Sequence, residues 1–123
     1  MSSNDPYAHV ELTRDEVDAL RGPVIIEFGT NWCGYCQGAQ RVIGTALAGH
    51  DAVRHIKVED GKGRRLGRSF AVKLWPTLIF MRDGLEVARA VRPDNAQDLI
   101  GPVQAIEAPA LPTELAGEPG ALQ

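Results

Sequence analysis

The chain has 123 residues, of which 44% are hydrophobic and 24% charged, and this length predicts one domain with a packed core. Thirteen basic against sixteen acidic residues give a formal net charge of −3, which argues against general attraction to nucleic acid. Apolar stretches such as residues 78–81 are far too short to cross a membrane, and residues 1–10 lack the apolar core of a signal peptide. Taking Met1 as the native start, we expect a cytoplasmic protein with neither nucleic acid nor membrane as a partner.

Strands and helices are predicted to alternate from the start of the chain. Residues 8–11 can form a short edge strand, and a capping box that begins at Thr13 predicts a helix over residues 13–20. Residues 24–28 are β-branched and almost wholly apolar, which predicts a central strand covered on both faces. Glu27 is the exception within this strand.

The second part of the chain continues the alternation. Apolar residues three and four apart predict an amphipathic helix over residues 33–47, and residues 53–58 read as a further strand. A short helix is predicted within residues 60–72. The Asp-Gly pair in the middle of residues 76–91 predicts a tight hairpin, and a last helix is expected from about residue 94 to residue 106.

This order of elements predicts the fold class. The alternation ends in a hairpin and a helix, which favours an α/β fold with a mixed sheet of four or five strands and helices on both faces. Residues 108–123 hold three of the eight prolines and show no periodicity. We therefore expect a domain over residues 1–107 followed by a flexible tail over residues 108–123.

Cys33 and Cys36 are the only cysteines of the chain, and Gly34 and Tyr35 separate them. A disulfide that closes so short a loop stabilises less than the ~3 kcal/mol expected for a fifteen-residue loop, so stability is a poor reason for the pair. In a reducing compartment, an isolated C-x-x-C motif indicates either redox chemistry or half of a metal site.

The apolar strand 24–28, the Trp-Cys-Gly-Tyr-Cys run at a helix start and the distant Trp75-Pro76-Thr77 form a specific combination. Over roughly residues 8–107 the chain resembles the thioredoxin family. The resemblance implies a thioredoxin fold and a thiol–disulfide oxidoreductase that reduces disulfide-containing protein substrates without a bound cofactor. It also implies recycling by a thioredoxin reductase or glutathione, in electron transport and cell redox homeostasis. We expect a monomer.

The helix start gives the two cysteines different predicted roles. Cys33 falls at or just before the first turn, where unpaired backbone N–H groups and the helix dipole favour a thiolate, so it is the predicted nucleophile. Cys36 lies one turn later on the same face, close enough to attack a mixed disulfide on Cys33. Because Cys36 is more enclosed, we expect it to keep its proton and to act as the resolving thiol.

Glu27 interrupts the apolar strand directly below this helix. Burial raises the pKa of a carboxyl group, which would let Glu27 exchange a proton near neutral pH. The matching position in thioredoxins is usually aspartate, and the resemblance implies that Glu27 accepts the proton of Cys36. The alternative is a glutamate at a strand end that turns to solvent.

The resemblance also implies a substrate-binding surface made of Trp32, Gly34, Tyr35, Trp75 and Pro76. Pro76 is cis in the family and lies against the disulfide, which leaves the preceding backbone free to pair with an extended substrate. The alternative is a trans proline that opens an edge strand. Trp75 is either an exposed landing surface for substrates or an ordinary core residue.

Several positions depart from the usual thioredoxin pattern. Gly29 stands where many members carry tryptophan, and Gln37 stands where lysine is common. Gly34-Tyr35 replaces the usual Gly-Pro and resembles the motif of bacterial disulfide isomerases, which predicts a reduction potential above that of a typical thioredoxin. An exported disulfide isomerase or oxidase, and a binding module whose redox activity is secondary, therefore stay open as alternatives.

Two further patterns have competing interpretations. The spacing of Cys33, Cys36, His50 and His55 comes close to a zinc finger, but the intervening residues lack the aromatic core that a finger needs. We expect no metal, with His50 at a helix end and His55 on a strand surface. The basic run within residues 62–73 is either a solvated helix face or a docking patch for acidic partners or glutathione.

Overall fold

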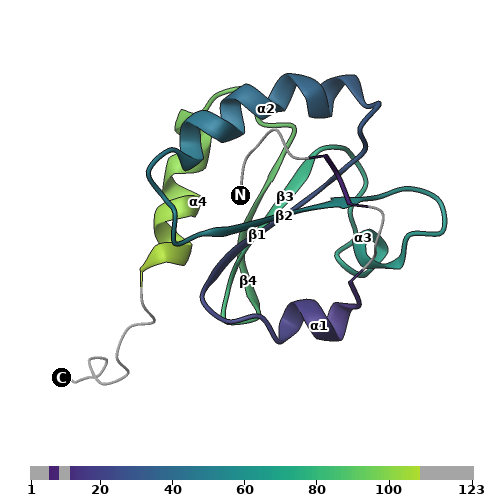
Figure 1. Ribbon diagram of the computed structural model, residues 1–123, viewed down its shortest axis with the longest axis horizontal. Coiled ribbons are helices and arrows are strands. Elements are labelled where there is room, and N and C mark those ends of the chain that lie inside the picture. The colour runs from purple at the N-terminus through teal and green to yellow at the C-terminus, as the bar shows by residue number, and fades with distance from the viewer. Residues whose placement is uncertain (1–5, 9–11, 109–123) are drawn as a thin grey trace.

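A mixed sheet of four strands forms the centre of the protein (Figure 1). The computed structural model describes residues 6–8 and 12–108. In chain order the strands are β1 (Pro23–Gly29), β2 (Arg54–Glu59), β3 (Thr77–Arg82) and β4 (Leu85–Val91). Their spatial order is β2-β1-β3-β4, with β1 parallel to β2 and antiparallel to β3, and β3 antiparallel to β4. This arrangement confirms the predicted mixed sheet.

Helices cover both faces of this sheet, as predicted (Figure 1). They are α1 (Arg14–Asp18), α2 (Gly34–Leu47), α3 (Arg65–Ser69) and α4 (Gln97–Glu107). Helices α2 and α4 pack on the face that carries Ile25 and Phe80, whereas α1 and α3 pack on the face that carries Ile26 and Ile79. Because neighbouring residues of a strand point to opposite faces, both faces of β1 and β3 must be apolar.

The ends of several elements follow from local chemistry. The predicted capping box is present, since Thr13 Oγ1 accepts a hydrogen bond from Glu16 N at 3.0 Å and Glu16 Oε1 accepts one from Thr13 N at 2.8 Å. Helix α4 begins at Gln97, later than predicted. The side chain of Asn95 accepts from Gln97 N at 2.9 Å, and this turn stops the helix from extending toward residue 94.

The hairpin between β3 and β4 turns on Asp83 and Gly84, as predicted. Their φ angles are +51° and +83°, the left-handed values that a two-residue turn needs at both central positions. Glycine adopts such an angle freely, and aspartate tolerates it better than most side chains do.

The N-terminal segment lies along the outer edge of β2. Of the edge strand predicted over residues 8–11, Ala8 lies within the described residues and forms an isolated parallel bridge with Val58. Ala8 N donates to Lys57 O at 2.9 Å, and Glu59 N donates to Ala8 O at 3.0 Å. These bonds fix Tyr7, the preceding residue, close to the carboxyl end of β1. The predicted tail lies, after Ala108, outside the described residues.

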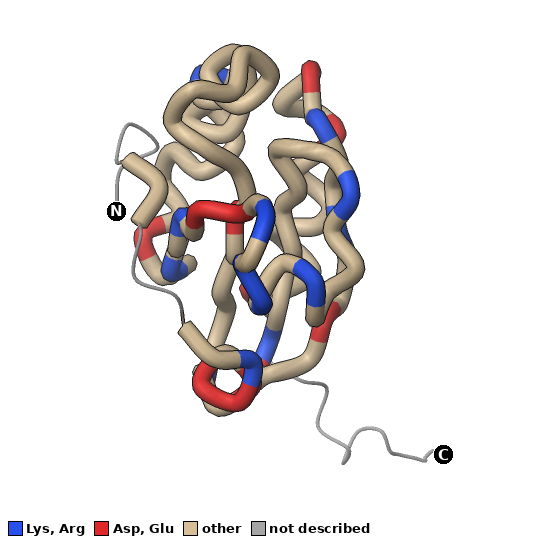
Figure 2. Tube along the Cα trace, turned by 90° about the vertical axis from the view of Figure 1, so that its right-hand side faces the viewer, with Lys and Arg blue, Asp and Glu red and all other residues tan. Residues whose placement is uncertain are grey.

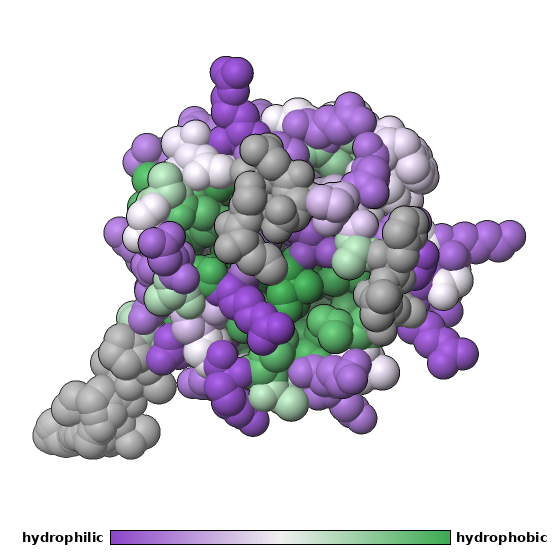
Figure 3. Space-filling view, in the orientation of Figure 1, coloured by the Kyte–Doolittle hydropathy of each residue, from purple (hydrophilic) through white to green (hydrophobic). Residues whose placement is uncertain are grey.

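Polar and apolar side chains occupy different parts of the face shown in Figure 3. In Figure 3, apolar residues show in the middle of the face, over the strands, and hydrophilic residues surround them. None of the helices in the described part of the chain is both long enough and apolar enough to span a bilayer.

Candidate active site

Cys33 is the N-cap residue of α2, so its side chain lies at the open end of the helix. Its Sγ accepts a hydrogen bond from Cys36 N at 3.2 Å, and both cysteines are free thiols. A backbone N–H that points at a sulfur at the positive end of a helix stabilises negative charge there. Cys33 is therefore placed as a nucleophile requires.

Cys36 lies deeper than Cys33, with 1% of its surface exposed against 8% for Cys33. Burial, followed by the contact with the Cys33 side chain, raises the pKa of the Cys36 thiol to about 12. Cys36 thus keeps its proton in the reduced protein. Before it can attack, another group must take that proton.

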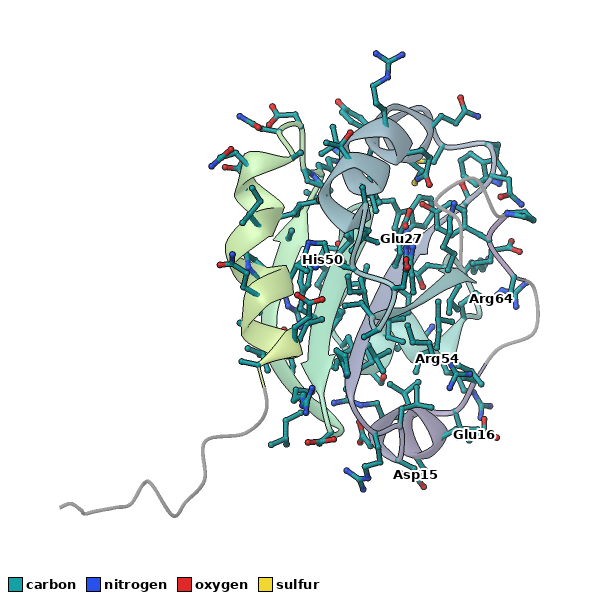
Figure 4. All side chains as sticks on the ribbon, turned by 60° about the vertical axis from the view of Figure 1, so that its left-hand side comes forward. Asp15, Glu16, Glu27, His50, Arg54 and Arg64 are labelled. Carbon is teal, nitrogen blue, oxygen red and sulfur yellow. The ribbon has the colours of Figure 1, made fainter. Side chains whose placement is uncertain are left out.

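Glu27 is fully buried on β1 beneath α2 (Figure 4), so the solvent-facing alternative is wrong. Its carboxylate accepts three hydrogen bonds, from the Tyr7 hydroxyl, from Gln40 Nε2 at 2.9 Å and from His55 Nε2 at 2.7 Å. Burial by itself raises the pKa of Glu27, but the three donors outweigh it and hold that pKa below its ordinary value. The raised pKa predicted from burial is therefore wrong, and Glu27 is ionised.

His55 and Lys57 reach the same interior region from β2. In the parallel register, His55 pairs with Ile25 and Lys57 pairs with Glu27, which sets both side chains on the face covered by α2. His55 is 2% exposed, so its predicted surface position is wrong. Its Nε2 faces the carboxylate, which assigns the N–H to that nitrogen, and Lys57 Nζ donates to Gln40 Oε1 at 2.7 Å.

Sequence reasoning missed the residues that surround Glu27. Two signals for them were present: His55 and Lys57 are polar at alternate positions of a strand, and Gln40 lies one helical turn after Cys36. Tyr7 gave no comparable signal.

The lack of a side chain at Gly29 makes room for Tyr7. A Cβ atom added at Gly29 would lie 2.6 Å from Cys36 Sγ and 2.9 Å from both Cζ and the hydroxyl oxygen of Tyr7. Tyr7 is buried and packs with Cys33 and Cys36 in one small cluster. Tyr7 and the Cys36 thiol thus occupy the space that a side chain at position 29 would need.

We expect Gly29→Ala to destabilise the fold by about 1–3 kcal/mol, because the Tyr7 ring and the Cys36 thiol must both shift to admit a methyl group. Denaturant unfolding of the reduced protein measures this change. Gly38→Ala is the matched control: a Cβ there meets nothing within 4 Å, and replacing glycine in a helix stabilises by about 1 kcal/mol. Equal stability of Gly29→Ala and the parent protein would contradict the steric argument.

Aromatic side chains border the cysteines on the outside. Trp32 and Tyr35 are 72% and 62% exposed, and the Trp32 ring meets the Trp75 ring edge-on with centroids 5.7 Å apart. Trp75 is half-buried: it packs against the cysteine cluster, and its Nε1 donates to Asp60 Oδ2 at 2.8 Å. Trp75 therefore falls between the two predicted alternatives, and Trp32 presents the more open apolar surface.

The Trp75–Pro76 peptide bond is cis, so the trans alternative is wrong. The carbonyl oxygen of Trp75 accepts a hydrogen bond from Arg92 Nε at 2.8 Å, and the Arg92 guanidinium lies 3.8 Å from the centre of the Tyr35 ring. The backbone before Pro76 is thus not wholly free, in contrast to what the resemblance implied. A hollow of about 650 Å³ opens beside Arg92 and Tyr35 and continues along the exposed start of α2.

The two histidines of the zinc-finger alternative are both engaged with carboxylates. His50 Nδ1 lies 2.8 Å from Glu107 Oε2 (Figure 4 labels His50), and His55 is bound to Glu27, so both histidines are paired with carboxylates. Within residues 6–8 and 12–108, no cluster of three or more histidine, cysteine or acidic side chains is arranged to hold a metal ion.

The basic run lies around α3, on the side of the molecule that Figure 2 faces. A hollow of about 380 Å³ there runs up to Trp75 and is lined by four cationic residues, Lys62, Arg64, Arg68 and Lys73. Arg64 Nη2 pairs with Glu59 Oε1 at 3.3 Å. The cations therefore border a recess that reaches Trp75, in addition to facing solvent.

Two thiols lie at a helix start beside a cis-proline, Cys33 at the helix end and Cys36 deeper in the protein near a carboxylate. This arrangement defines a thiol–disulfide oxidoreductase site. Comparison with known proteins agrees. The family model described as Thioredoxin matches residues 9–105, and the chain belongs to the thioredoxin family. Its fold is the thioredoxin fold, as the resemblance implied.

The chain matches three of its relatives over most of their length. Thioredoxin 2 from Pseudomonas aeruginosa PAO1, solved in its reduced form, is 51% identical with a TM-score of 0.76, covering 85% of this chain and 96% of that one. Thioredoxin from Chlamydia trachomatis is 34% identical over 79 residues, covering 64% of this chain and 78% of that protein. Thioredoxin Asp f 28 from Aspergillus fumigatus is 28% identical over 87 residues, covering 71% and 81%.

Proposed function

We propose that the protein reduces disulfides in protein substrates through a two-thiol cycle, in which it is oxidised by the substrate and then reduced again. The Cys33 thiolate attacks a substrate disulfide, forms a mixed disulfide and releases one substrate sulfur as a thiolate. Cys36 then loses its proton and attacks the Cys33 sulfur, which releases the second substrate sulfur and leaves a Cys33–Cys36 disulfide. A thioredoxin reductase or glutathione supplies the two electrons that regenerate the dithiol.

The observation that carries this proposal is the unequal burial of the two cysteines, with Cys33 Sγ accepting a hydrogen bond from the backbone N–H of Cys36. Cys33 sits at the helix end where charge is stabilised, and Cys36 is protonated beneath it. Such a pair favours attack by one thiol and delayed attack by the other, which is the order that disulfide reduction needs.

In this cycle we propose that Glu27 accepts the proton that Cys36 loses. The carboxylate is ionised in the resting protein and is shut off from water by its burial. The mixed disulfide removes the Cys33 charge and hydrogen bond that help to raise the pKa of Cys36, so proton loss becomes easier at the step that needs it.

Substrates are proposed to bind across Trp32 and Tyr35, with Gly34 between them and Trp75 and Pro76 on the other side of Cys33. The exposed rings offer apolar area near the nucleophile, and the adjacent hollow has room for residues that flank the substrate disulfide. Arg92 already donates one hydrogen bond to the Trp75 carbonyl, so a substrate that pairs there uses the second lone pair of that oxygen or displaces Arg92.

The reduction potential of the Cys33–Cys36 pair, equilibrated against glutathione, together with insulin reduction in the same sample, tests the proposal. We expect insulin to be reduced and the potential to lie above the ~−270 mV of thioredoxin, because Tyr35 replaces the usual proline. A potential near the ~−120 mV of a strong oxidant, with no insulin reduction, would favour the exported isomerase or oxidase. No thiol exchange at all would favour a binding module.

We further propose that the protein works as a monomer in the cytoplasm, where the glutathione poise keeps such a pair reduced. Trapping thiols with an alkylating agent in intact cells should then find Cys33 and Cys36 in the dithiol form. A disulfide in unstressed cells would place the protein in an oxidising compartment.

A further inference from the structure

Tyr7 lies between the buried carboxylate and the resolving thiol and has no part in the cycle described above. Its hydroxyl donates a hydrogen bond to Glu27 Oε2, and its side chain packs with Cys36 in one buried cluster. Cys36 Sγ and the Tyr7 oxygen are neighbours, since both lie within 3 Å of the point that a Cβ at Gly29 would occupy. The single phenolic proton is engaged with Glu27, so in a proton transfer between the two the thiol is the donor and the Tyr7 oxygen the acceptor.

We propose that Tyr7 relays the proton of Cys36 to Glu27 when Cys36 resolves the mixed disulfide. The thiol proton passes to the Tyr7 oxygen while the phenolic proton passes to Glu27 Oε2. At the same time the Cys36 sulfur bonds to the Cys33 sulfur, and the bond between Cys33 and the substrate sulfur breaks, so the substrate leaves as a thiolate. Glu27 ends protonated and Tyr7 ends as it began. This inference rests on the proposed function.

The hydrogen bonds around Glu27 favour a relay over direct transfer. The carboxylate already accepts from Tyr7, Gln40 and His55, so its oxygens face donors other than the thiol. Gln40 Nε2 also bonds the carboxylate, but it meets Cys36 at the backbone carbonyl, whereas the Tyr7 oxygen lies beside the thiol itself. Direct transfer would require the tyrosine to leave this position.

Tyr7 is held in place from several sides. Its backbone N donates to Asn31 Oδ1 at 2.9 Å, the ammonium of Lys57 lies 4.7 Å from the ring centre, and Gln40 Nε2 approaches the hydroxyl at 3.4 Å. Burial and the neighbouring Glu27 charge raise the pKa of Tyr7, so the hydroxyl keeps a proton at rest. It can pass a proton on only when it receives one.

The test separates the two chemical steps with DTNB, an aromatic disulfide that releases one coloured thiolate in each step. Attack by Cys33 releases the first in a reaction that depends on DTNB concentration, and resolution by Cys36 releases the second in a reaction that does not. We expect Tyr7→Phe to slow the second release by about tenfold to a hundredfold at neutral pH, within the range for a lost proton-transfer group, and to leave the first release nearly unchanged.

Two comparisons distinguish a relay from a packing role. Glu27→Gln should slow the same step, and the double variant Y7F/E27Q should be no slower than the slower single variant, because both changes break one path. Gln40→Met removes another donor from the same carboxylate oxygen, together with its bonds to the Cys36 carbonyl, the Tyr7 hydroxyl and Lys57, but it leaves the thiol, the phenol and the carboxylate in place. If only the charge state of Glu27 mattered, Gln40→Met would slow resolution as much as Tyr7→Phe; the relay predicts a clearly smaller effect.

The pH profile gives a further readout. Without the relay, resolution depends on ionisation of the thiol to solvent, so in Tyr7→Phe the second release should become faster as pH rises, more steeply than in the parent protein. Resolution within twofold of the parent rate, or effects of Tyr7→Phe and Glu27→Gln that multiply in the double variant, would overturn the relay. Failure of the parent protein to reduce insulin would instead overturn the proposed function.

Discussion

Cys36→Ser is expected to accumulate covalent complexes with substrate proteins, because Cys33 can still attack but nothing resolves the mixed disulfide. Disulfide reduction should fall by at least about a thousandfold, as for loss of a residue that takes part in bond formation. After rapid thiol quenching, non-reducing electrophoresis should show adducts that disappear on addition of a reductant. The position of Cys33 at the helix end, with Cys36 buried below it, is the reason for this asymmetry.

Cys33→Ser is the matched control, since it removes the other thiol from the same helix turn. It should abolish both reduction and the adducts, and the double serine variant should behave like it. Adducts that persist in Cys33→Ser and vanish in Cys36→Ser would reverse the assigned roles. Thermal unfolding of the serine variants checks that the loss of activity is chemical, because a buried hydroxyl is more polar than the thiol it replaces and can itself destabilise the fold.

Glu27→Gln is expected to slow resolution by about a hundredfold at neutral pH, the middle of the range for general acid–base catalysis, while attack by Cys33 stays nearly unchanged. Glutamine keeps the size of the side chain and one acceptor oxygen for the donors around it. The two coloured phases of the DTNB reaction measure both steps in one experiment. An unchanged second phase would remove Glu27 from proton transfer.

Glu27→Gln should also change how the free energy of unfolding depends on pH. A carboxyl group whose pKa is lowered on folding contributes stability above the pH at which glutamates ordinarily titrate, and that contribution is lost as pH falls through the folded-state pKa. The parent protein should therefore lose stability toward acid more steeply than Glu27→Gln does. Denaturant unfolding at a series of acidic pH values gives the comparison, and parallel curves would contradict the low pKa of Glu27.

Local patterns predicted the parts of this protein that depend on neighbours in the chain. The capping box at Thr13, the turn at Asp83 and Gly84 and the helix that Cys33 caps each result from a few consecutive residues. The family resemblance added the position of Pro76, where a cis bond has no local signature apart from the proline itself.

The surroundings of Glu27 could not be predicted in the same way. Its three donors, Tyr7, Gln40 and His55, lie 20, 13 and 28 positions away in the chain and come from different elements. Burial could be inferred from an apolar strand, and burial alone raises the pKa of a carboxyl group. The donors that reverse the shift become visible only when β2, α2 and the N-terminal segment meet on one face of the sheet.

The edge bridge at Ala8 places the preceding residue, Tyr7, against the two cysteines. Two backbone bonds to β2 hold the segment whose tyrosine closes the space above Gly29. This short segment covers the interior of the site, where Cys36 and Glu27 are both almost wholly shielded from solvent. Shortening the protein to begin at the first helix would expose them, so any fusion or truncation that is meant to keep the redox pair intact has to retain these residues.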